Sequence, residues 1–162
     1  MANANSAAAS ATADREIATT RLLDAPRKLV WKVWTDPEHI KEWWGPVGFT
    51  TTTKKFDLRP GGQWLFTMHG PDGTDYRNDV TYTDVVEPER IEYDHGPSPT
   101  FHATILFDEE SDTRTRLSMQ MLFETVEVRD YTVEKFGAVK GLNQTLDRLT
   151  EFLRTEVAKI RE

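Results

Sequence analysis

The sequence predicts an α+β fold in which one long C-terminal helix covers one face of an antiparallel sheet. Two observations predict it. Residues 50–123 alternate polar and apolar side chains between short turn segments, as strands do. Residues 136–157 carry an apolar side chain every three or four positions, which is the period of a helix with one buried face. Neither element can bury its apolar side alone, so we expect helix and sheet to pack together.

The chain length indicates one folded unit. A protein of 162 residues is large enough to bury a core without cross-links. Residues 1–14 are mostly Ala, Asn, Ser and Thr, a composition that buries too little apolar surface to offset the entropy of ordering. We therefore expect a disordered tail over 1–14 and a single domain over 15–162.

A strand and two short helices are predicted first. Residues 17–23 alternate as a strand and end at a turn, and Pro26 suits the first turn of a helix that continues to Thr35. Thr35-Asp36-Pro37 repeats this start signal for a helix over 38–42. The loop that follows, Trp43-Trp44-Gly45-Pro46, joins two indoles to residues that break regular structure. We expect this tryptophan loop either to form the lip of a cavity or to plug the end of the core.

The strands that follow are predicted to form hairpins. Turn residues interrupt the alternation at 60–62, 70–73, 87–89, 96–97 and 109–113. Connections this short favour antiparallel neighbours, because parallel pairing needs a long crossover. The sheet is therefore expected to be a meander.

The last helix contains two glycines, Gly137 and Gly141, one turn apart. Glycine costs about 1 kcal/mol in a helix interior. The pair predicts a close approach of another segment, a bend, or room for a ligand.

Strand parity selects the side chains that face the helix. Several of them are aromatic or methionine, and a few carry a polar group that needs a partner when buried. Either the core is solid, or sheet and helix leave a cavity. If there is a cavity, its predicted lining is Trp43, Trp44, Phe66, Met68, Tyr76, Asn78, Tyr82, Tyr93, Phe101, Met119, Met121 and Phe136.

Composition and charge exclude some classes of binding partner. The net charge of −7 disfavours nucleic acid and anionic lipid. The absence of cysteine and of any long apolar run predicts a cytoplasmic protein that does not insert into membranes.

No catalytic or metal motif is found, so we predict no cofactor, no metal and no assigned catalytic residue. The histidines lack metal-ligand spacing, and strand parity points His69 and His102 outward. His95 has the parity of Ile91 and Tyr93 and could reach a cavity or simply bond the backbone at a strand end.

Several motifs occur together in a fixed order. They are Asp24-Ala25-Pro26, Val30-Trp31, Trp34-Thr35, Pro37 and Trp43-Trp44-Gly45-Pro46, then Leu58-Arg59-Pro60-Gly61-Gly62 with Trp64, Gly70-Pro71-Asp72-Gly73 and Glu87-Pro88-Glu89-Arg90. In order and spacing they resemble the heat-shock-protein-90 ATPase activator homologue family of the START-related, birch-pollen-allergen-like (SRPBCC) superfamily.

The resemblance implies a helix-grip fold, in which a curved antiparallel sheet wraps around the C-terminal helix and often leaves a ligand cavity. The leading hypothesis is therefore a binding protein for a small, largely apolar molecule of the lipid or aromatic class. The second is a polyketide cyclase or dehydratase-like enzyme, for which His95 and the inward tyrosines would transfer protons. The third is a chaperone-regulating interaction module, the role that the family name records.

Overall fold

The computed structural model describes residues 13–161, which form one seven-stranded antiparallel sheet and four α-helices. The elements in chain order are η1 (Ala13–Arg15), β1 (Glu16–Leu23), α2 (Arg27–Thr35), α3 (Pro37–Trp43), β2 (Thr50–Phe56), β3 (Gln63–His69), β4 (Asp75–Val86), β5 (Arg90–Gly96), β6 (Phe101–Ser111), β7 (Arg114–Phe123), α4 (Val126–Phe136) and α5 (Ala138–Arg161). The α+β class and the long last helix are confirmed.

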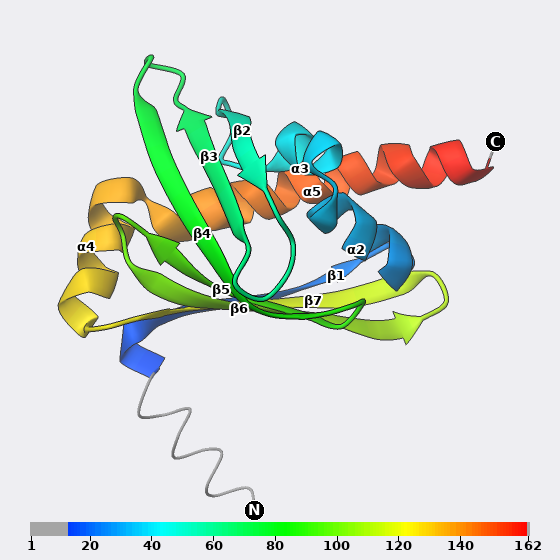
Figure 1. The fold of residues 1–162 in the computed structure, drawn as a ribbon. Coiled ribbons are helices and arrows are strands. Elements are labelled where there is room, and N and C mark those ends of the chain that lie inside the picture. The colour runs from blue at the N-terminus through cyan, green and yellow to red at the C-terminus, as the bar shows by residue number, and fades with distance from the viewer. Residues whose placement is uncertain (1–12, 162) are drawn as a thin grey trace, which may run out of the picture.

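The sheet is a meander with one addition. Its strand order is β1-β7-β6-β5-β4-β3-β2, so the strands after the tryptophan loop pair with their chain neighbours as predicted. The first strand then joins the far edge, where Ile17 lies opposite Met121. The sheet is curved and open, and α5 runs along its concave side (Figure 1). This is the arrangement of a helix-grip fold.

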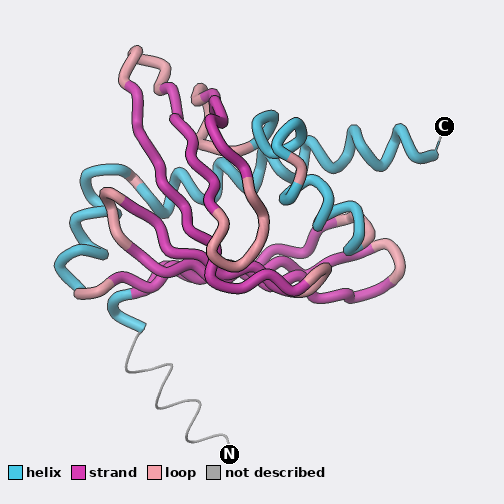
Figure 2. The backbone as a smooth tube through the Cα atoms, viewed as in Figure 1, coloured by secondary structure: helices cyan, strands magenta, loops and turns pink. Residues whose placement is uncertain are grey.

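Helices α2 to α5 all lie on the concave side of the sheet, and the other side carries none of them (Figure 2). The core therefore lies between the inner sheet face and these helices. Its fully buried members include Val33 of α2, Ile40 of α3, Phe107 of β6 and Leu149 of α5. The outer face is polar: His69 contacts Asp75, and His102 contacts Glu92 and Asp94. Both histidines lie on the outward face, as parity predicts.

Helix α4 corrects the sequence analysis, which placed Phe136 at the start of the last helix. Phe136 instead ends α4, and Gly137 follows in the left-handed conformation at φ 59°. The helix begins where the Thr125 hydroxyl accepts a hydrogen bond from the Val128 amide. Its sequence was missed because Val126 and Val128 alternate like a strand and most of its side chains are at least partly exposed.

The left-handed turn predicts different costs for two substitutions. Gly137→Ala should lower the free energy of unfolding by about 1 kcal/mol, because a Cβ disfavours this φ. Gly137→Asn should cost less, since Asn tolerates the left-handed region. Urea unfolding of both variants measures this. An alanine variant as stable as wild type would contradict the assignment of Gly137 as the cap of α4.

The prediction of a disordered tail falls mostly on residues 1–12, which lie outside the described residues. Of the predicted tail, Ala13 and Asp14 belong to the short helix η1. The start of the domain at residue 15 therefore stays a prediction. Within residues 13–161, no helix combines the length and the apolar character that a bilayer crossing requires.

Candidate functional site

A pocket of about 310 Å³ lies between the inner face of the sheet and helices α4 and α5. Strands β3 to β7 supply one wall, and the tryptophan loop closes the end beside α5. Most of its lining is apolar. Pockets of a few hundred Å³ with an apolar lining and a few polar groups are typical of small-molecule sites.

All but one of the predicted cavity residues line this pocket. They are Trp43, Trp44, Phe66, Met68, Tyr76, Asn78, Tyr93, Phe101, Met119, Met121 and Phe136. Tyr82 does not line it. The β2–β3 hairpin folds over Tyr82, and the Phe56 ring lies 6.4 Å from the Tyr82 ring. Tyr82 therefore packs in the core between Phe56 and Tyr93.

The two loop tryptophans have different surroundings. Trp43 is fully buried, and its indole N–H donates to the Val33 carbonyl at 3.1 Å. This bond satisfies one of the orphan carbonyls at the end of α2. Trp44 is only partly buried, and its ring meets Trp64 edge-on at 5.1 Å. Both indoles line the pocket. The tryptophan loop therefore closes the end of the core and also forms part of the pocket wall.

Arg148 holds the tryptophan loop in place from α5. Its Nη1 donates to the carbonyls of Trp44, Gly45, Pro46 and Phe49, and Nη2 donates to that of Glu42. Burial lowers the pKa of this guanidinium, and the Glu42 carboxylate opposes the effect. The group stays charged because arginine ordinarily titrates far above neutral pH.

Helical periodicity alone places Arg148 on the polar face of the last helix, yet its side chain is partly buried against the tryptophan loop. A guanidinium satisfies several carbonyls at once, which no apolar residue could do. Hydrogen bonds from a side chain to backbone carbonyls do not depend on the residue types of the loop. The sequence therefore contains no pattern that predicts this contact. Gly141 has a related role: a Cβ there would lie 3.2 Å from the Pro46 ring. Of the three possibilities predicted for the glycine pair, a close approach of another segment is what the structure has at Gly141.

His95 lies in the pocket wall within a short polar network. Its Nδ1 lies 2.7 Å from the Pro99 carbonyl, and its Nε2 lies 2.6 Å from Asn78 Oδ1. The Asn78 amide in turn donates to the Tyr76 carbonyl. The His95 ring also stacks on Phe101 at 4.5 Å.

This network is one proton short when His95 is neutral. Both ring nitrogens face oxygen acceptors, the Pro99 carbonyl and Asn78 Oδ1, but a neutral imidazole carries only one N–H. Turning the Asn78 amide over moves the conflict to the Tyr76 carbonyl without removing it. Burial lowers the pKa of His95, whereas the Pro99 hydrogen bond and the Asp79 carboxylate favour the charged form. The imidazolium alone satisfies every contact.

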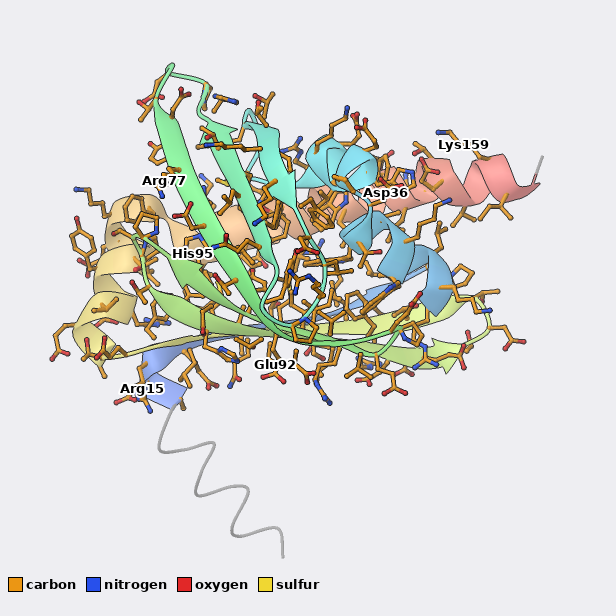
Figure 3. The ribbon with its side chains drawn as sticks, viewed as in Figure 1. Arg15, Asp36, Arg77, Glu92, His95 and Lys159 are labelled. Atoms are coloured by element: carbon orange, nitrogen blue, oxygen red, sulfur yellow. The ribbon has the colours of Figure 1, made fainter. Side chains whose placement is uncertain are left out.

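The remaining ionisable groups of the pocket are basic or phenolic. Arg77 is exposed and donates through Nε and Nη2 to Asp79. Lys135 lies over the Tyr131 ring, with Nζ 5.4 Å from the centroid. Burial raises the pKa of Tyr93, so this phenol stays protonated at neutral pH. Arg77 and His95 lie near the same end of the sheet (Figure 3). By strand parity His95 faces inward, whereas Arg77 shares the outer face of the sheet with Glu92.

Some lining residues were missed from the sequence. They are mainly Trp34, Phe49, Pro99, Thr132, Leu142 and Leu146. Trp34 contacts Phe107 of the sheet and also reaches the pocket. Its indole N–H is buried without an acceptor among the described residues. Such an orphan donor is rare in native proteins.

The structure holds no recognisable metal or catalytic centre in its described part. Within residues 13–161, no three His, Asp or Glu side chains are grouped as a metal site would require. Both His95 ring nitrogens have hydrogen-bond partners within the protein.

Comparison with known proteins agrees with the fold. The family model described as activator of Hsp90 ATPase homolog 1-like protein matches residues 24–154. A protein from Arthrobacter aurescens is similar in structure, with a TM-score of 0.81 and 25% identity over 89% of this chain and 88% of its own. A protein from Nitrosomonas europaea gives 0.79 and 26% over 89% and 97%. No curated protein matches the chain.

Proposed function

This chain belongs to the activator of Hsp90 ATPase homolog 1-like family, and we propose that it encloses a small, largely apolar ligand between the sheet and α5. The observation that carries the proposal is the pocket of about 310 Å³ lined by aromatic and methionine side chains. Folds of this superfamily commonly bind hydrophobic molecules, but fold alone does not name the ligand. The family name alone assigns no partner.

Burial of the ligand would supply most of the binding energy. Apolar surface removed from water is worth about 25 cal/mol per Å². Met119 and Met121 provide an adaptable wall, since methionine adjusts to irregular shapes. The unpartnered indole N–H of Trp34 supports the proposal, because a ligand could bring the acceptor that the wall lacks.

The two alternatives have weaker support. An enzyme of the cyclase or dehydratase kind would need a free proton-transfer group, and His95 is fully engaged. An interaction module that regulates a chaperone would need an apolar docking face, whereas ion pairs such as Arg90–Asp84 occupy the outer sheet. A cytoplasmic location remains a prediction from composition.

Two neighbouring residues of β7 provide a test. Met121 lines the pocket, whereas Leu122 points to the opposite face of the sheet. Met121→Trp should fill the pocket and weaken ligand binding by about tenfold or more, equivalent to about 1.4 kcal/mol. Leu122→Trp is the matched control and should bind like wild type.

The measurement is a thermal-shift screen of fatty and aromatic molecules, followed by calorimetric titration of each hit. Native mass spectrometry of protein isolated from its own host would detect a retained ligand. Circular dichroism checks that both variants fold. The proposal fails if no molecule shifts the wild-type melting temperature and no mass is retained, or if both variants bind equally well.

A further inference from the structure

The charged residues that line the pocket are all of one sign. Apart from its tyrosines, the ionisable residues that line it are Arg77, His95 and Lys135, and no Asp or Glu of the described residues is among them. The chain as a whole has 27 Asp plus Glu against 20 Lys plus Arg. The charged lining thus has the opposite sign to the net charge of the chain. We infer that the pocket selects apolar molecules that end in one anionic group, such as a carboxylate.

The basic side chains gather at the open end of the pocket. Arg77 near the start of β4 and Lys135 at the end of α4 are exposed, whereas Trp34 and Trp43 at the other end are buried. An apolar tail would therefore lie against the tryptophans with its head at the mouth. A carboxylate held there keeps part of its hydration and avoids the full cost of burying a charge.

Lys135 supplies the net positive charge. Arg77 is paired with Asp79, so it adds little net charge. Lys135 has no ion pair with a carboxylate among the described residues. His95 adds the same sign when protonated, and a nearby anion favours that form.

A simpler explanation covers only part of this pattern. A cation in the last turn of α4 is favourable with the helix dipole, which accounts for Lys135 alone. It does not account for the absence of carboxylates from the lining. The nearby acids Glu124 and Glu127 line a separate hollow beyond Ser98 and Pro99. Acidic groups are thus close by but excluded from the pocket itself.

The inference rests on the proposed function and is tested with three molecules that share one tail: decanoate, decan-1-ol and decylammonium. Each is titrated by calorimetry below its micelle-forming concentration. Wild type should bind decanoate about tenfold more tightly than decan-1-ol, and decylammonium most weakly. The net charge of −7 would by itself favour decylammonium over decanoate. Tighter binding of decanoate would therefore show the effect of the basic residues that line the pocket.

Two lysines provide the matched variants. Lys135→Gln should reduce the advantage of decanoate to about twofold or less and leave decan-1-ol unchanged. Lys140, exposed in the first turn of α5 and outside the lining, is the control, and Lys140→Gln should behave like wild type.

Different failures have different meanings. Equal binding of acid and alcohol, preferred binding of the ammonium, or equal effects of both lysine variants would overturn the inference and leave the proposed function standing. If none of the three molecules binds and the wider screen of fatty and aromatic molecules also finds nothing, the proposed function itself is wrong and the inference falls with it.

Discussion

Replacing Trp43 by alanine is expected to lower the free energy of unfolding by about 4 kcal/mol. The side chain is fully buried and packs edge-on against Trp34 at 4.9 Å and Trp44 at 5.5 Å. Its removal leaves a cavity and also leaves the Val33 carbonyl without its indole donor. Urea unfolding followed by circular dichroism measures the loss.

Two further variants separate packing from hydrogen bonding. Trp43→Phe keeps a ring but removes the N–H, and it should cost about 1–3 kcal/mol. Trp44→Ala should cost only about 2 kcal/mol, since Trp44 is partly exposed and no hydrogen bond to Val33 is lost. If the two alanine variants were equally unstable, the distinction between a buried anchor and a lining residue would be wrong.

The contrast between these adjacent tryptophans shows where sequence reasoning reached its limit. The Trp-Trp-Gly-Pro run predicted a shaped loop at the end of the core, and the loop is there. Which indole is the anchor depends on the carbonyl at the end of α2 and on the approach of Trp64. Those contacts join residues of different elements, and no local pattern encodes them.

The sheet and the site were predictable to different degrees. Period-two alternation identified the inner face of each strand, because alternate side chains must point to opposite sides. That rule found most of the pocket lining that the strands supply. It could not exclude Tyr82, since the hairpin that covers it is placed by tertiary packing. It also could not reveal α4, whose Lys135 and Thr132 complete the pocket from outside the sheet.

The basic lining illustrates the same limit. Arg77 has the outward parity of β4, and Lys135 lies in a helix that was not predicted. In the sequence, both residues have acidic residues nearby and look like ordinary exposed cations. Only the assembled fold brings both into the lining of one pocket. Charge in a site of this kind is a property of the assembled fold.

Arg148→Met is expected to lower the free energy of unfolding by about 2–3 kcal/mol and also to weaken ligand binding. The variant keeps an apolar stem of similar length but removes the donors to five carbonyls of residues 42–49. Charged hydrogen bonds of this kind are worth about 1.5–3 kcal/mol in net stability. The loop supplies Trp44 and Phe49 to the pocket, so its release should disturb both properties together.

The control is Arg154→Met on the same helix. Arg154 is exposed and pairs only with Glu151, so its loss should change stability by less than about 0.5 kcal/mol. Arg148→Lys should recover only part of the loss, because one ammonium cannot present the planar fork that reaches carbonyls on both sides. Urea unfolding and hydrogen exchange of the amides at 47–49 measure stability and loop order separately. If Arg148→Met changed neither the stability nor the hydrogen exchange of the loop, the tryptophans alone would hold the loop, and the guanidinium would not be needed to shape the pocket.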